Sequence, residues 1–123
     1  MPGMRGLTIM VVTADPERFR GALTLACSHA ALRARVRVYC HERAVSLLRS
    51  DSGPADPPDL FEHGLPDRSA LLALAMESGV GIIACQTGLD LCGVAIGDVV
   101  PGVEAGGMMG VVATLGEDRL VTI

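Results

Sequence analysis

Cys85 is the residue best placed for chemistry. It ends the apolar run from Val80 to Ala84 and precedes Gln86 and Thr87. The run predicts a buried strand, and the residues after it predict a tight turn or short helix. N–H groups at the start of a helical turn lower the pKa of a thiol and favour the thiolate, the nucleophile of sulfur transfer and redox chemistry. Gln86 and Thr87 are then candidate accessory residues. The alternative is a buried cysteine that packs as a small hydrophobe.

Cys92, Cys40 and His41 are further candidate accessory residues. Cys92 lies seven residues after Cys85 and is a candidate second sulfur site or resolving thiol. Across a helix that spacing is roughly 10 Å, whereas a disulfide needs Cα atoms within about 7 Å, so direct pairing requires local unwinding. Cys40 and His41 end another predicted strand at the same sheet edge, where an imidazole can stabilise a thiolate. Core packing for the cysteines and a surface position for His41 are the alternatives.

The composition excludes several other kinds of chemistry. All ten basic residues are arginine, so Schiff-base, pyridoxal phosphate and Walker-type phosphate chemistry, which need lysine, are excluded. A net charge of −4 and only two phenylalanines and one tyrosine give no basis for binding nucleic acid. The His and Cys spacings match no zinc pattern, so we expect no metal and no cofactor. No stretch approaches the ~18 apolar residues of a membrane span.

Alternating strands and helices must position these residues. Apolar runs predict strands over residues 7–13, 36–40, 80–85 and 119–123, with a short strand or extended piece over 98–100. Helical spacing predicts helices over residues 16–33, 42–50, 67–78 and 104–115, the first and third capped by Asp15 and Asp67. Arg35 and Arg37 alternate with valines in the second strand, which indicates a wetter face or an edge position.

This order predicts one α/β domain over residues 1–123. The expected fold has three layers, with a mostly parallel sheet of about five strands and helices on both faces. Functional sites in such folds gather at the carboxyl ends of strands, near a topological switch point. Residues 50–59 contain three prolines and predict a mobile loop. The first apolar run is too short for a secretory signal, so we expect a cytoplasmic protein with reduced thiols.

Three stretches resemble the DsrE/DsrF-like family, which includes the TusD-type sulfur carriers. Residues 81–93 contain Cys-Gln-Thr-Gly-Leu-Asp-Leu-Cys-Gly, where family members often have a sequence like Cys-Gly-Thr-Cys-Leu-Asp-Ala-Arg-Gly. Residues 100–108 are similar to the segment before the last helix of the family, and residues 118–123 to its terminal strand. The resemblance covers the whole chain loosely and residues 80–123 more specifically.

The resemblance implies a sulfur-relay protein, a candidate sulfurtransferase or sulfur carrier. Cys85 would hold sulfane sulfur as a persulfide, received from a donor protein and passed to an acceptor protein. The family also implies a five-stranded sheet and assembly into homo-oligomers or hetero-hexamers. Two departures stand out: Gly88 replaces a second cysteine of many relatives, and Cys92 replaces a frequent arginine, whose positive charge could help to hold a thiolate.

Two other functions remain open from the sequence. One is a thiol redox protein of the peroxiredoxin-like kind, which would pair Cys85 with Cys92 or Cys40. The other is a non-catalytic oligomer subunit or interaction module, in which the glycines and methionines of residues 106–110 pack against a neighbouring subunit. The alternative for that segment is close packing of a helix on the sheet within one chain.

Overall fold

Five parallel strands form one sheet in the computed structural model, which describes residues 4–50 and 56–123. The strand order is β4-β3-β2-β1-β5. The strands are β1 (Leu7–Val11), β2 (Val36–Cys40), β3 (Gly81–Cys85), β4 (Glu104–Gly106) and β5 (Arg119–Thr122). The helices are α1 (Pro16–Ala31), α2 (Asp59–Glu62), α3 (Arg68–Glu77), α4 (Gln86–Cys92) and α5 (Met108–Ala113), with 3-10 helices η1 (Glu42–Leu48) and η2 (Ile96–Asp98). The three-layer α/β fold is confirmed.

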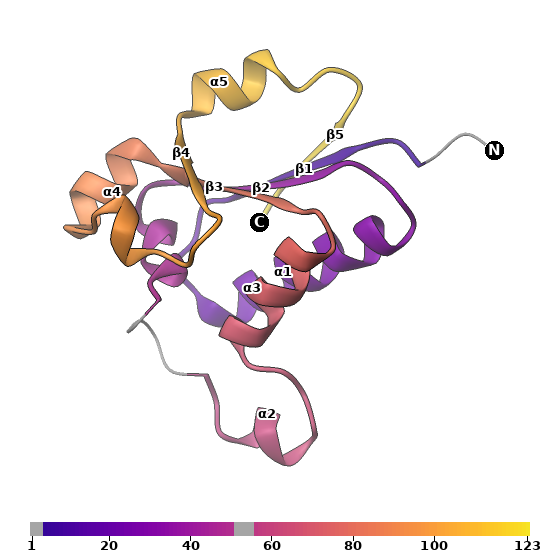
Figure 1. Cartoon of the computed structure of the whole chain (residues 1–123), viewed down its shortest axis with the longest axis vertical. Coiled ribbons are helices and arrows are strands. Elements are labelled where there is room, and N and C mark those ends of the chain that lie inside the picture. Colours follow the sequence, from indigo (N-terminus) through magenta and orange to yellow (C-terminus); the bar gives the residue numbers. More distant parts are fainter. Residues whose placement is uncertain (1–3, 51–55) are drawn as a thin grey trace.

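Helices cover both faces of the sheet. Figure 1 shows α1 and α3 on one face, α5 on the other, and α4 beside the carboxyl end of β3. Phe19, Leu23 and Ala26 recur at helical spacing and bury one side of α1. Residues of β1 alternate between the faces, so Ile9 and Val11 lie towards α1 and α3, whereas Thr8 lies towards α5. The aliphatic core is therefore concentrated between the sheet and the α1/α3 layer.

Two helix starts follow from the local sequence. The Asp15 carboxylate accepts a hydrogen bond from the Glu17 N–H at 3.1 Å, and Pro16 is the first helical residue. The Asp67 carboxylate likewise accepts from the Ala70 N–H at 2.8 Å at the start of α3. Both predicted caps are confirmed, and they fix where the chain turns back towards the sheet.

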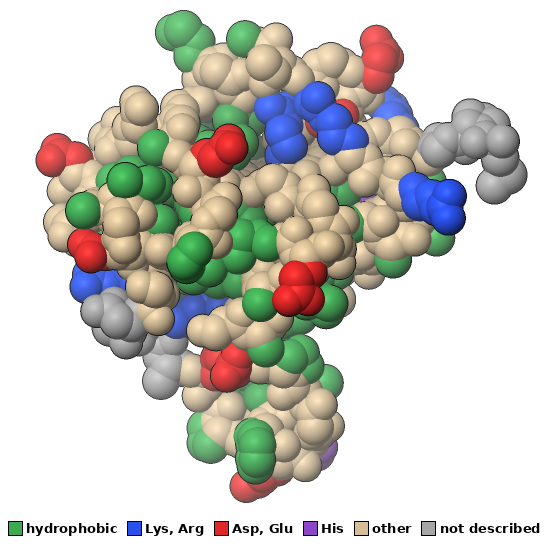
Figure 2. All heavy atoms as spheres, in the orientation of Figure 1, with side chains coloured by type: hydrophobic (Ala, Val, Ile, Leu, Met, Phe, Trp, Pro, Cys, Tyr) green, Lys and Arg blue, Asp and Glu red, His purple; other side chains and the backbone are tan. Residues whose placement is uncertain are grey.

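A polar network attaches α5 to the sheet. The Thr8 hydroxyl donates to Asp118 at 2.8 Å, and the Arg35 guanidinium pairs with the same carboxylate at 3.0 Å. Arg37 donates to the Val111 carbonyl at 3.1 Å, near the end of α5. Figure 2 shows basic side chains gathered on this face, beneath α5. The edge position considered for the second strand is wrong, because β2 lies between β1 and β3 and its arginine is accommodated by these acceptors.

The predicted helix over residues 104–115 is wrong at its start. Residues 104–106 form β4, which pairs with β3, and α5 begins only at Met108. A Cβ at Gly106 would lie 2.8 Å from Ile83 Cγ2, so glycine allows β4 to approach β3 this closely. The short strand expected over residues 98–100 is also wrong at its start, because Asp98 ends η2; Val99 is extended and forms an isolated bridge with Arg49 outside the sheet.

The proline-rich segment is described only in part. Residues 51–55 of the predicted loop lie outside the described residues, and the short helix α2 that follows was not predicted. Asp56 accepts from the Arg68 N–H at 2.7 Å, which ties the segment to the start of α3. Among the described residues, every helix is too short or too polar to cross a membrane.

Candidate functional site

Cys85 lies at the junction of β3 and α4, as predicted. It is the last residue of the strand and the N-cap of the helix, and its sulfur accepts a hydrogen bond from the Gly88 N–H at 3.3 Å. The residue is only 4% exposed. The strand therefore delivers a thiol to the carboxyl edge of the sheet, and the first turn of α4 directs an N–H at its sulfur.

Opposing effects act on the ionisation of Cys85. Burial is the largest of them and by itself raises the thiol pKa. Hydrogen bonds from the Tyr39 hydroxyl and from the backbone N–H groups of Glu42, Gly88 and Thr87 act in the other direction. The hydrogen bonds prevail together, so the pKa of Cys85 lies below the ordinary value of 9.0. The thiolate is thus favoured by hydrogen-bond donors at the carboxyl end of β2 and in the residues that follow β2 and β3. A positively charged neighbour is not what favours it.

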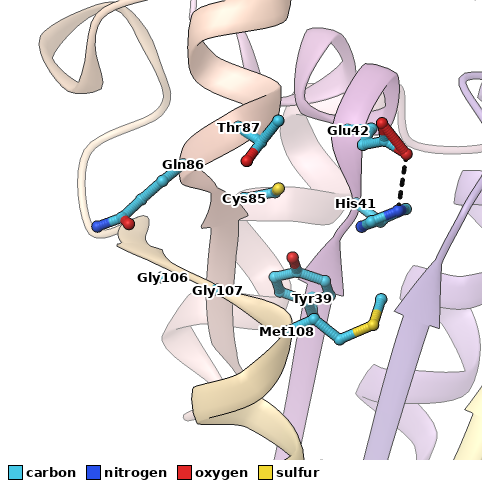
Figure 3. Close-up of a pocket in the computed structure, with 9 residues that line it drawn as sticks. All are labelled: Tyr39, His41, Glu42, Cys85, Gln86, Thr87, Gly106, Gly107 and Met108. Carbon is cyan, nitrogen blue, oxygen red and sulfur yellow. Dashed lines mark ion pairs between the residues drawn. The ribbon is translucent and has the colours of Figure 1, made fainter.

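A cavity of about 360 Å³ opens beside the sulfur. It is lined by Tyr39, His41, Glu42, Cys85, Gln86, Thr87, Gly106, Gly107 and Met108 (Figure 3). His41 Nε2 lies 2.9 Å from the Glu42 carboxylate, and the rings of His41 and Tyr39 are 6.0 Å apart. Among the described residues that line the cavity, His41 is the one side chain able to carry a positive charge, since no arginine lines it.

Three of the predicted accessory residues meet at this cavity. Gln86 and Thr87 begin α4, and His41 follows β2, so each reaches the cavity from the carboxyl edge of the sheet. The site lies at the ends of β2, β3 and β4. The candidate site does not lie at the topological switch point, because the strand order reverses between β1 and β5, on the other side of β2.

Cys40 lies on the opposite face of the sheet from Cys85. The register pairs Cys40 with Ala84, and neighbouring residues of a strand point to opposite faces. Cys40 is fully buried, and burial raises its pKa to about 12. This cysteine is a packed thiol of the α1/α3 layer, and a bond between it and Cys85 would require the sheet to rearrange.

Cys92 is separated from Cys85 by the whole of α4. Its sulfur lies 4.0 Å from the carbonyl oxygens of Glu42 and Arg43, so it packs against η1 and does not line the cavity. The helical rise puts it roughly 10 Å along the axis from Cys85. All four cysteines are free thiols.

Tyr39 and Glu42 are site residues that the sequence reasoning missed. Tyr39 has the same strand parity as His41 and lies on the Cys85 face of a neighbouring parallel strand, which is a signal that the sequence contains. Glu42 contributes its backbone N–H from a left-handed conformation, with φ of 47°. Nothing in the side-chain pattern indicates that conformation, which non-glycine residues adopt rarely.

Comparison with known proteins gives the fold and nothing finer. No protein-family model matches the sequence, and no curated protein matches it. Two solved structures match nearly the whole chain. The ychN protein from E. coli has a TM-score of 0.77 and 19% identity, over 98% of this chain and 100% of that one. This chain shares the fold of the ychN protein. The protein of unknown function MTH1491 from Methanobacterium thermoautotrophicum matches with a TM-score of 0.76 and 18% identity, over the same shares of the two chains. Within the ychN fold, the chemistry of this chain has to be argued from its own cavity.

Proposed function

We propose that the protein is a sulfur carrier that accepts sulfane sulfur on Cys85 as a persulfide and passes it to an acceptor thiol. The observation that carries the proposal is the combination of a favoured thiolate and an adjoining cavity at Cys85. Cys40 is buried with a raised pKa, and burial also raises the pKa of Cys27. Of these three cysteines, Cys85 is therefore the one best suited to act as a nucleophile.

The proposed loading step is an exchange at sulfur. The Cys85 thiolate attacks the outer sulfur of a persulfide R–S–SH, a new S–S bond forms, and the donor S–S bond breaks. The donor leaves as the thiolate R–S⁻, and Cys85 holds –S–SH. In the return step, an acceptor thiolate attacks the outer sulfur and Cys85 leaves as the thiolate. Atoms and charge balance in each step, and no external oxidant or reductant is required.

The cavity and the sequence resemblance both support this proposal. The space of about 360 Å³ accommodates the added sulfur and the end of a donor or acceptor chain. The same hydrogen-bond donors that favour the thiolate can solvate the anionic leaving group of the return step. The segment around Cys85 resembles the DsrE/DsrF-like family, and the ychN fold is compatible with that resemblance.

The geometry gives less support to intramolecular redox chemistry. Cys85 and Cys92 lie at opposite ends of α4, beyond the separation of about 7 Å that a disulfide needs. Cys40 is on the other face of the sheet. A redox function would need α4 to unwind before any bond could form.

Intact-mass spectrometry tests the proposal. Reduced wild-type protein, Cys85→Ser and Cys92→Ser are exposed to a low-molecular-weight persulfide and weighed before and after reduction. We expect wild type and Cys92→Ser to gain one sulfur that reduction removes, and Cys85→Ser to gain none. Transfer is then followed by adding an acceptor thiol and recording loss of the added sulfur.

Each other outcome argues against the proposal. Loading of Cys85→Ser to the wild-type extent would place the reaction at a different thiol. Absence of loading in wild type, with Cys85 open to alkylation, would favour the interaction-module function. Loss of two hydrogens instead of a gain of sulfur would favour the redox function.

A further inference from the structure

We infer that Gly88 is a positioning residue, whose lack of a side chain lets the η1 backbone lie against α4 so that the Glu42 N–H reaches the Cys85 sulfur. The inference deepens the proposed function, because it concerns how the nucleophile of that function is held as a thiolate. It assigns to Gly88 a role that acts through Glu42, in addition to the hydrogen bond from its own N–H.

The contact between α4 and η1 leaves no room for a side chain at Gly88. A Cβ built there would lie 2.4 Å from the Glu42 carbonyl oxygen, 3.0 Å from the Glu42 carbonyl carbon and 2.6 Å from Val45 Cγ2. Real Cβ atoms essentially never come within 3.0 Å of such neighbours. Two of the three contacts are with backbone, which cannot rotate aside as a side chain can. Any larger residue would therefore displace Glu42.

Glu42 is the residue of η1 whose backbone N–H forms a hydrogen bond with the Cys85 sulfur. Its φ of 47° lies in the left-handed region, and its N–H donates to Cys85. The neighbouring backbone is fixed on the other side, because the His41 N–H donates to the Val11 carbonyl at 2.9 Å. Non-glycine residues hold this conformation only where the surroundings enforce it. The close contact with Gly88 holds the Glu42 backbone in this conformation from the α4 side.

Two other glycines near the cavity, Gly107 and Gly110, do not share this constraint, whereas a Cβ at Gly106 would meet Ile83 instead of Glu42. A Cβ at Gly107 or Gly110 would meet nothing within 4 Å. Gly110 lies in α5, another short helix beside the site. It is therefore a matched control for an alanine substitution, since backbone propensity changes in the same way and no contact with Glu42 is involved.

The close contact also explains one departure from the DsrE/DsrF-like pattern. A cysteine in place of Gly88 would meet the same Glu42 carbonyl, so this placement of η1 and a second sulfur at that position exclude each other. In this chain the carbonyl group of Glu42 occupies the space that a second thiol would need.

The pH dependence of Cys85 reactivity is the appropriate measurement. The titratable side chains that face the sulfur are Tyr39, His41 and Glu42, from β2 and η1. The residues that line the cavity from the α4, β4 and α5 sides are uncharged, namely Gln86, Thr87, Gly106, Gly107 and Met108, while Glu104 of β4 lies on the same face of the sheet two residues before Gly106. Gly88→Ala and Gly110→Ala leave all of these side chains in place. A change in the profile therefore reports on the backbone donors.

The test measures alkylation of Cys85 against pH, by peptide mass spectrometry, in wild type, Gly88→Ala and Gly110→Ala. We expect the midpoint for Gly88→Ala to move to higher pH, with about a tenfold fall in alkylation rate at neutral pH, as for loss of one hydrogen bond to a charged group. Gly110→Ala should follow the wild-type profile. A folded Gly88→Ala protein with a wild-type profile would overturn the inference.

A second measurement decides the matter should Gly88→Ala fail to fold. In ¹H–¹⁵N spectra of wild type, the Glu42 amide proton should shift with the midpoint of Cys85 ionisation, and this shift should vanish in Cys85→Ser. A Glu42 amide that ignores Cys85 ionisation would refute the inference. Neither readout uses sulfur transfer, so failure of the proposed function would leave these results intact, and the reverse also holds.

Discussion

At Cys85, four hydrogen-bond donors offset the burial of a thiol. Three are backbone N–H groups, and the fourth is the hydroxyl of Tyr39, itself 1% exposed. Burial and its hydrogen bond to Cys85 raise the pKa of Tyr39, so the phenol stays protonated and remains a donor wherever the thiolate forms. The pair is arranged so that the proton stays on the oxygen while the sulfur ionises.

Tyr39→Phe tests this arrangement. The ring is kept and the hydroxyl is lost, so the fold should survive while the pKa of Cys85 rises. We expect alkylation of Cys85 at neutral pH to slow by about tenfold, with the midpoint moved to higher pH. Circular dichroism serves as the control for folding. An unchanged alkylation profile would mean that the backbone donors alone hold the thiolate.

Cys40 predicts a loss of stability at alkaline pH. Burial raises its folded pKa to about 12 from an ordinary 9.0, so the unfolded chain ionises first as pH rises. Its contribution is fully present below pH 9 and is lost as pH rises towards 12; between pH 9 and 10 it lowers the unfolding free energy by about 1 kcal/mol.

Urea unfolding at pH 8, 9 and 10 under reducing conditions measures this effect in wild type and Cys40→Ala. The variant should lose less stability over this range, by about 1 kcal/mol. Tyr39 and Cys27 titrate in both proteins and cancel in the comparison. Parallel pH curves for the two proteins would contradict the prediction.

The helices and strands whose residues carry a strong local signal, such as a cap or an apolar run, could be predicted from the sequence. Those that form only because they contact another segment could not. Asp15 and Asp67 mark helix starts through their own carboxylates, and the sequence alone identifies them. The strand at 104–106 has three residues with little β-propensity and exists because it pairs with β3. Gly106 indicated that another backbone could approach closely, but the sequence does not identify which one. A short edge strand of this kind is beyond what periodicity can reveal.

The candidate site likewise contains residues that the sequence predicts and a backbone donor that it does not. Cys85, Gln86 and Thr87 were predicted because a strand end followed by a helical turn is visible in the residue types. His41 was predicted as a member of the same sheet edge, and the structure brings it to the same cavity. The η1 backbone donor was not predictable, because the left-handed Glu42 depends on a contact between segments more than 40 residues apart.

At the scale of the whole molecule, a charged network attaches α5 to the sheet, and only Val111 of this helix is buried. The Asp118 side chain is 7% exposed and pairs with Arg37, at 15%, and with Arg35, while accepting from buried Thr8. The network joins β1, β2 and the segment after α5. Because Met108 of α5 lines the Cys85 cavity, these charges also set the position of one cavity wall.

Asp118→Ala should therefore weaken the fold and release α5. Removing the carboxylate leaves the Thr8 hydroxyl without its acceptor and Arg37 without its counter-charge, and we expect a loss of about 3 kcal/mol in urea unfolding. Amides of α5 should exchange faster than those of α1. Arg18→Ala is the control, because Arg18 and Asp15 form an exposed pair at 3.8 Å whose loss should change stability by less than about 1 kcal/mol. Equal effects of the two substitutions would show that the network is not structural.

The position of Tyr39 has an optical consequence. The chain contains one tyrosine and no tryptophan, and that tyrosine forms a wall of the cavity and touches the Cys85 sulfur through its hydroxyl. The protein's ultraviolet fluorescence therefore arises from a single phenol next to the thiol. Ionisation of the sulfur, attachment of a second sulfur or entry of a donor would each alter the surroundings of that phenol. The emission of the unlabelled protein is thus a direct, real-time signal of the state of Cys85.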